Sequence, residues 1–212
     1  EQANVLYHPN GITTDGFSCN ENVVSPPTVG FLARLCPLKG LDILIDAFLI
    51  LKKSSKHTDL RLEIAGGMTE EDEPFVQEQK DKLESASLSA CSIFRPNIER
   101  DEKLKFLRGL NVFSVPSRYP EAFGLYVIEA LAAGTPVVLP KSGAFPEIVE
   151  DTGGGIIYDD NNPSDLAIAL DQILKDSEGS KKMGIFGRDV VLEKYSNEKL
   201  AKSLVDNILD RK

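Results

Sequence analysis

The feature that most constrains the fold is a regular alternation between short apolar runs and longer segments with helical spacing. Six apolar runs of four to six residues occur at positions 28–33, 60–65, 91–94, 112–115, 136–139 and 155–158. Helical spacing of apolar residues follows over residues 41–56, 70–88, 104–110, 122–133, 145–149, 163–175, 179–195 and 197–210. This alternation favours an α/β fold with a doubly wound, parallel, six-stranded Rossmann-like sheet and helices on both faces.

The composition limits the partners that this chain can bind. Its 212 residues carry a formal net charge of −9, and an acidic surface repels the phosphate backbone of nucleic acids. Three cysteines without CxxC spacing and two histidines do not favour a disulfide framework or a metal site. There is no signal peptide and no run of about eighteen apolar residues that would span a membrane. We therefore expect a cytoplasmic protein without a metal and without a direct membrane span.

The first 27 residues differ from the rest of the chain. They lack an initiator Met, and residues 13–27 are rich in Thr, Asn, Ser and Pro, as a connector would be. We expect residues 1–27 to link this chain to a preceding part of a longer protein. Residues 28–195 are then predicted to form the Rossmann-like domain, and residues 196–212 a C-terminal helix.

Loops that follow the predicted strands are the expected ligand-binding positions, because ligands of such sheets bind beyond the carboxyl ends of the strands. These loops comprise residues 34–40, 66–67, 95–99, 116–124 and 140–147. Arg34 and Lys39 lie in the first loop; an Arg offers a planar fork suited to phosphate, and a Lys a mobile point charge. Surface cations are also often simply solvated, so these two residues alone leave both interpretations open.

Glu129 lies in the middle of the predicted helix 122–133, and the stretch 123–134 around it is otherwise apolar on every face. A buried carboxylate has to be neutral, paired or bound to a ligand. Glu129 is therefore expected to contact either an Arg or Lys of the fold or a bound molecule.

Glu121 precedes Glu129 by eight residues and lies where the predicted helix begins. The free N–H groups and the dipole of a helix start favour an anion such as a diphosphate. Two carboxylates beside a diphosphate would suit the hydroxyl-bearing rings that flank it in a nucleotide-sugar. The helix dipole alone also favours a carboxylate at this position, so a purely structural role for Glu121 remains open.

Five short motifs follow one another along the chain. They are Arg34-Leu-Cys-Pro-Leu-Lys39-Gly40, Ala65-Gly66-Gly67, Val115-Pro116-Ser117, Glu121-Ala-Phe-Gly-Leu-Tyr-Val-Ile-Glu129-Ala-Leu-Ala-Ala-Gly134-Thr-Pro-Val-Val138 and Gly143-Ala-Phe-Pro-Glu147. Each motif alone is weak, but their order and spacing together resemble the donor-binding domain of the family 4 retaining glycosyltransferases. The resemblance covers almost the whole chain. It implies the C-terminal half of a GT-B fold, in which two Rossmann-like domains enclose the active site.

The resemblance also implies a role for each matching residue. The donor-binding residues are expected to be Arg34, Lys39, Gly66, Glu121, Phe123, Gly124, Leu125 and Glu129, with Arg95, Pro96 and Asn97 in the nucleobase loop. Arg34 and Lys39 would hold the diphosphate, Glu121 the transferred sugar and Glu129 the ribose hydroxyls. Arg34, Lys39 and Glu121 are the expected catalytic residues. The family needs no metal or other cofactor, because Arg, Lys and the helix dipole neutralise the leaving diphosphate.

The implied function is transfer of a hexose-like sugar from a nucleoside-diphosphate-sugar to an acceptor hydroxyl, with retention of configuration, in carbohydrate biosynthesis. The expected partners are the nucleotide-sugar and a missing N-terminal acceptor domain of the same chain, toward which residues 196–212 would pack. This fragment alone is expected to be inactive. Two alternatives stay open: a GT-B epimerase or phosphorylase-like enzyme, and a non-catalytic α/β interaction module. The GxGxxG of nicotinamide-dependent enzymes and the GxxxxGK[ST] of P-loop NTPases are both absent.

Overall fold

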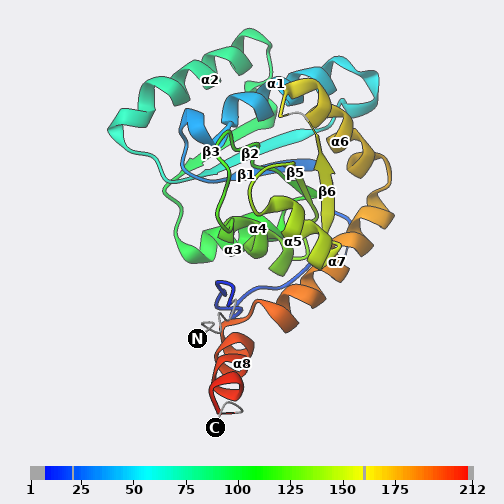
Figure 1. Ribbon diagram of the computed structural model, residues 1–212. Helices are drawn as coiled ribbons and strands as arrows, with labels where there is room; N and C mark the ends of the chain where they lie inside the picture. Colours follow the sequence, from blue (N-terminus) through cyan, green and yellow to red (C-terminus); the bar gives the residue numbers. More distant parts are fainter. Residues whose placement is uncertain (1–7, 21, 160, 210–212) are drawn as a thin grey trace.

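The computed structural model describes residues 8–20, 22–159 and 161–209, which form a parallel sheet covered by helices on both faces (Figure 1). Its strands are β1 (Thr28–Leu32), β2 (Arg61–Gly66), β3 (Ser92–Pro96), β4 (Val112–Phe113), β5 (Val137–Pro140) and β6 (Gly155–Tyr158). They are hydrogen-bonded in the order β3-β2-β1-β4-β5-β6, and every neighbouring pair is parallel. The predicted doubly wound, six-stranded Rossmann-like sheet is confirmed.

Helices pack on the sheet in two layers. They are α1 (Leu41–Lys53), α2 (Glu73–Ser85), α3 (Arg100–Arg108), α4 (Leu125–Ala132), α5 (Phe145–Thr152), α6 (Pro163–Lys175), α7 (Ser177–Lys194) and α8 (Asn197–Leu209). In Figure 1, α1, α2 and α6 lie on one side of the sheet and α3, α4 and α5 on the other. Helix α7 packs along α4 and α5, whereas α8 projects away from the body.

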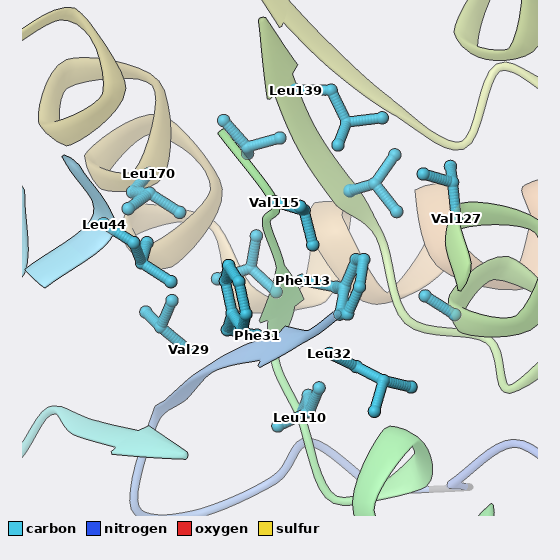
Figure 2. Close-up of a cluster of buried hydrophobic side chains, with 14 of the residues drawn as sticks. Val29, Phe31, Leu32, Leu44, Leu110, Phe113, Val115, Val127, Leu139 and Leu170 are labelled. Atoms are coloured by element: carbon cyan, nitrogen blue, oxygen red, sulfur yellow. The ribbon is translucent and has the colours of Figure 1, made fainter. Parts of the chain in front are cut away.

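Strands β1 and β4 form the buried centre of the sheet. Val29, Phe31 and Phe113 have no exposed surface, and Figure 2 shows them among side chains from the surrounding helices. Val29 and Phe31 lie near Leu44 of α1 and Leu170 of α6. Parallel strands that are covered on both faces are apolar throughout. This burial explains the short continuous apolar runs in the sequence.

The structure corrects the start of the predicted helix 122–133. Helix α4 begins at Leu125, because Gly124 before it has a left-handed backbone with φ of 74°. A glycine adopts this conformation without steric cost, and a residue in it does not continue an α-helix. Glu121 and Phe123 therefore lie in a loop, and only the second half of the spacing between Glu121 and Glu129 is helical.

Other predicted boundaries differ by a few residues. The predicted helix 41–56 ends at Lys53 and is followed by a 3₁₀ turn, Ser55–His57. The predicted helix 70–88 divides into a 3₁₀ turn, Glu70–Asp72, and α2. The fourth strand pairs only over Val112–Phe113. Asp210, the predicted last residue of the C-terminal helix, lies outside the described residues.

The described part of the predicted connector packs against the junction of α7 and α8. The side chains of Ile12 and Phe17 are buried. The Ile12 N–H donates to the Tyr195 carbonyl, and the Asn197 N–H donates to the Ile12 carbonyl, both at 2.9 Å. The segment around Ile12 is thus held against the base of the C-terminal helix, whereas Asp15 and Ser18 accept hydrogen bonds from Arg100 and Arg108 of α3.

Gly66, at the end of β2, allows two neighbouring loops to lie in close contact. Its φ is 140°, and a Cβ atom at this position would lie 1.7 Å from the carbonyl oxygen of Ala33, which follows β1. A Cβ atom on the adjacent Gly67 would meet no atom within 4 Å. Packing therefore requires the first of these two glycines and not the second.

We predict that Gly66→Ala lowers the free energy of unfolding by about 3 kcal/mol, because it combines backbone strain with a steric clash. Gly67→Ala is the matched control and should change it by less than about 0.5 kcal/mol. Urea unfolding of both variants measures the difference. Equal stability of the two variants would contradict the close contact at Gly66.

Candidate functional site

The candidate site lies where the strand order changes direction, between β1 and β4. At such a switch point the chain leaves neighbouring strands toward opposite faces of the sheet, and a crevice opens at their carboxyl ends. Residues 34–40 follow β1 here, and residues 114–124 follow β4. The two loops contact each other directly, since the Arg118 N–H donates to the Leu38 carbonyl at 2.9 Å.

Lys39 and Glu121, predicted from separate motifs, meet where these two loops adjoin. The Lys39 ammonium donates to Oε1 of Glu121, and both side chains are mostly buried, with 24% and 13% of their surface exposed. The Ser117 hydroxyl lies 3.1 Å from the same Oε1 and 2.8 Å from the Tyr119 carbonyl oxygen. A carboxylate, an ammonium and a hydroxyl thus converge at the carboxyl edge of the sheet.

Tyr126, in the first turn of α4, lies beside this cluster. The Lys39 ammonium is 5.7 Å from the centre of its ring, a cation–π distance. Burial, and then the negative charge of Glu121, raise the pKa of the Tyr126 hydroxyl far above its ordinary value. The phenol is therefore protonated at neutral pH and is a potential hydrogen-bond donor.

Arg34 contacts the loop after β2. Its Nε donates to Oδ2 of Asp72 at 3.2 Å, and half of its side chain is exposed. The Asp72 carboxylate also accepts bonds from the backbone N–H and the hydroxyl of Thr69, at 3.0 and 2.9 Å. The Thr69 backbone bond and the Arg34 bond lower the pKa of Asp72, although burial opposes them. The bond to Asp72 raises the pKa of Arg34.

Glu129 forms an ion pair with Lys103 of α3. The distance between Oε1 and Nζ is 2.6 Å, and the two side chains are 18% and 25% exposed. Lys103 is thus a cation of the fold that pairs with Glu129, one of the two kinds of contact expected for this carboxylate. This ion pair joins α3 to α4 at the same edge of the sheet as Lys39 and Glu121.

Residues 123–125 form the entry to α4. Leu125 is 45% exposed, and the Phe123 ring packs 6.1 Å from the ring of Tyr195. Among the described residues, no side chain caps this helix start, and its first turn contains no acidic residue. The N-terminal end of α4 therefore has the positive dipole end that favours an anion.

The predicted nucleobase loop follows β3, which ends at Pro96. The Arg95 side chain is directed to Glu63 of β2, with 3.3 Å between Nε and Oε2. Asn97 has a left-handed φ of 55°, and its amide accepts from the Met68 N–H at 2.9 Å and donates to the Met68 carbonyl at 3.0 Å. Asn97 thereby joins the loop after β3 to the loop after β2.

In residues 8–20, 22–159 and 161–209, no helix is long and apolar enough to cross a bilayer. Cys19, Cys36 and Cys91 are free thiols. Over the same ranges, no three His, Cys, Asp or Glu side chains form a group that could hold a metal ion.

A family comparison places this geometry among known proteins. The sequence model of the family described as Glycosyl transferases group 1 matches residues 19–190. This chain belongs to that family. The match includes all six described strands and every predicted donor-site residue from Arg34 to Glu129.

Curated relatives of this glycosyltransferase chain are longer than the chain itself. The D-inositol 3-phosphate glycosyltransferase of Paenarthrobacter aurescens is 32% identical over 154 residues, which make up 73% of this chain and 37% of the relative. The GDP-mannose-dependent alpha-(1-6)-phosphatidylinositol monomannoside mannosyltransferase of Mycobacterium tuberculosis is 27% identical over 220 residues, covering 96% of this chain and 55% of the relative.

Solved structures show the same fold. The C-terminal domain of a glycosyl transferase group 1 family protein from Francisella tularensis has a TM-score of 0.77 and 28% identity, covering 88% of this chain and 100% of that one. An Anabaena protein in complex with UDP and glucose has a TM-score of 0.80 at 19% identity, covering 95% of this chain and 55% of that one. The predicted C-terminal domain of a GT-B glycosyltransferase is confirmed in family and fold.

Arg118 holds the Lys39 loop of this glycosyltransferase domain in place. Its two terminal nitrogens donate to both carboxylate oxygens of Asp42 in the first turn of α1, at 2.8 and 2.6 Å. One of them also donates to the Pro37 carbonyl at 2.6 Å. Burial acts to raise the pKa of Asp42, but the hydrogen bonds and charge of Arg118 lower it below its ordinary value of 3.8. The Arg118 guanidinium thus connects the loop after β4 to the loop after β1 and to the start of α1.

Several partners of the predicted residues in the candidate site could not be found from the sequence. Lys103 and Tyr126 have no local pattern that marks them, because their importance arises from contacts across the fold. Asp72 had a signal: Thr69 and Asp72 stand three residues apart, the spacing of a helix capping box, and the structure shows that box. The pattern identifies Asp72 as a cap but not as the partner of Arg34.

We predict that Asp42→Asn lowers the free energy of unfolding at pH 7 by about 1 kcal/mol, a value reduced because Arg118 is partly exposed. The folded-state pKa of Asp42 is depressed, so its contribution is present above pH 3.8 and is lost as the pH falls through the folded pKa. The difference from wild type should therefore shrink below pH 3.8, as measured by urea unfolding from pH 7 to 3.

The control is Asp46→Asn on the same helix, which removes a surface ion pair with Lys82. Its effect should stay within about 0.5 kcal/mol. If the difference in unfolding free energy between Asp42→Asn and wild type grows as the pH falls, the stabilising role of the Arg118–Asp42 hydrogen bonds is contradicted.

Proposed function

We propose that this chain is the donor-binding domain of a retaining, family 4 glycosyltransferase. The enzyme transfers a hexose from a nucleoside-diphosphate-sugar to an acceptor hydroxyl in carbohydrate biosynthesis. The observation that carries the proposal is the meeting of Lys39 and Glu121 at the switch point, next to the uncapped start of α4. A cation, a carboxylate and a helix dipole in one crevice match the chemistry of a sugar joined to a diphosphate.

The proposed roles follow the position of each side chain. Lys39, Arg34 and the start of α4 bind the diphosphate and stabilise the negative charge that develops on it as it leaves. Glu121 orients the transferred sugar, and the backbone of residues 123–125, with Gly66 on the opposite loop, lines the sugar and the phosphates. No covalent nucleophile is assigned, and the binding chemistry proposed here uses no metal ion.

Glu129 is proposed to accept hydrogen bonds from the ribose. Its pair with Lys103 uses Oε1, and a carboxylate accepts hydrogen bonds at both oxygens. The loop at residues 95–97 borders the same edge of the sheet and is proposed to contact the base. A GDP-mannose-dependent relative and a UDP-bound structural neighbour make guanosine and uridine donors the first to test.

We predict that the chain binds one of UDP, GDP or ADP and its hexosyl derivative, and that Glu129→Ala weakens this binding about 10- to 100-fold by removing charged hydrogen bonds. Isothermal titration calorimetry measures the affinities. Glu193→Ala is the control, because Glu193 forms a Lys199 pair on the exposed side of α7. Unchanged affinity in Glu129→Ala would contradict the proposed role of Glu129 in binding the ribose. Wild-type protein that binds none of the nucleoside diphosphates would favour a non-catalytic interaction module.

The acceptor site is proposed to lie on a second domain of the enzyme, since the chain spans 37% and 55% of the two relatives described above. Residues 196–212 would pack toward that domain; on α8, Leu204 and Val205 are 37% and 52% exposed. The cleft between the two domains would then contain the reacting sugar.

We predict that this chain binds the donor but transfers nothing, because the acceptor wall is on the other domain. The test is release of UDP from UDP-glucose, or of GDP from GDP-mannose, by the purified chain in the presence of sugar acceptors. Sustained release above the rate without protein would contradict the prediction.

A further inference from the structure

Tyr126 carries a buried polar atom that the roles proposed above do not use. Its hydroxyl oxygen is buried and has no hydrogen-bond partner among the described residues. The ring is held between Phe113 and Phe145, with centroid distances of 6.2 and 6.4 Å. Leaving a buried hydroxyl without a hydrogen bond is unfavourable, and a phenylalanine would fill the same space without that cost.

The hydroxyl faces the ion pair at the centre of the site. Glu121 raises the pKa of Tyr126 through its charge and through a side-chain contact with the hydroxyl, but this contact lies outside the normal geometry of a hydrogen bond. The Lys39 ammonium, which is bonded to Glu121, lies over the Tyr126 ring. Tyr126 therefore occupies a position beside both members of the pair.

Binding of a diphosphate changes what Lys39 contacts. An ammonium is a compact, mobile charge, and a diphosphate attracts it more strongly than a single carboxylate does. Glu121 is only 13% exposed, so a weaker bond to Lys39 leaves a mostly buried carboxylate in need of another donor. The Ser117 hydroxyl has one proton and already lies 2.8 Å from the Tyr119 carbonyl oxygen.

We infer that Tyr126 is a positioning residue. Its hydroxyl donates a hydrogen bond to the Glu121 carboxylate when Lys39 leaves Glu121 to contact the diphosphate of the donor. This inference rests on the proposed function, because it requires a diphosphate in the crevice. The exchange keeps the Glu121 carboxylate hydrogen-bonded and oriented toward the sugar while Lys39 is released. Tyr126 acts through Glu121 and Lys39 and does not itself touch the donor.

The test is Tyr126→Phe, which removes the hydroxyl and keeps the ring. Affinity for the nucleoside diphosphate that the wild type binds, measured by calorimetry with UDP, GDP and ADP, should fall about fivefold, the effect of one hydrogen bond. The melting temperature without nucleotide should stay the same or rise, because an unsatisfied hydroxyl is removed. Tyr119→Phe is the matched control; Tyr119 lies in the loop before α4, is 64% exposed, and its substitution should change neither value.

A double-mutant cycle with Glu121→Gln separates positioning from packing. In Glu121→Gln the carboxylate charge is absent and Lys39 is free, so adding Tyr126→Phe should change affinity by less than about twofold. An equal loss in both backgrounds, or unchanged affinity with a lower melting temperature in Tyr126→Phe alone, would overturn the inference. Wild-type protein that binds none of the three nucleotides would overturn the proposed function and this inference together, whereas binding that Tyr126→Phe leaves unchanged would overturn this inference alone.

Discussion

All strands of this sheet run in the same direction, and the position of every candidate side chain depends on that arrangement. Parallel neighbours require a crossover after each strand, so the carboxyl ends of all strands lie at one edge. Between β1 and β4 the crossovers lead to opposite faces, and the loops after these two strands adjoin at the switch point. Lys39 and Glu121, 82 residues apart in the sequence, meet there for this reason.

The candidate site is built from charges that are balanced across elements. Arg34 pairs with Asp72, Lys39 with Glu121, and Lys103 with Glu129. Partly buried charges are tolerated when they are paired, because each partner replaces some of the water that burial removes. A donor that carries two phosphates and several hydroxyls offers the same kinds of partner. Under the proposed function, such a ligand would exchange contacts within a site that is already organised. The Arg118 side chain holds the loops after β1 and β4 together.

Much of the architecture could be predicted from the sequence, because buried faces of strands and helices require apolar residues at characteristic spacings. Strands such as β1, covered on both faces, appear as continuous apolar runs, and α1 shows its inward face at helical spacing. The start of α4 was predicted three residues too early, because Ala122 and Phe123 extend the apolar stretch of the helix toward the N-terminus. The left-handed backbone of Gly124 prevents the helix from beginning before Leu125. Such a conformation does not change the spacing of apolar residues, so the sequence pattern does not reveal it.

The sequence by itself determined the parallel α/β class, the loops that follow the strands, the charged residues Arg34, Lys39 and Glu121 in those loops, and Glu129 in the helix that follows. These follow from local periodicity and from motif spacing, which the chain carries in its order of residues. Only the tertiary structure decided that Glu129 meets Lys103, that Arg34 meets Asp72, and that the Tyr126 hydroxyl faces Glu121. The physical reason is that these contacts join different loops and helices, so the geometry of the sheet edge selects each partner.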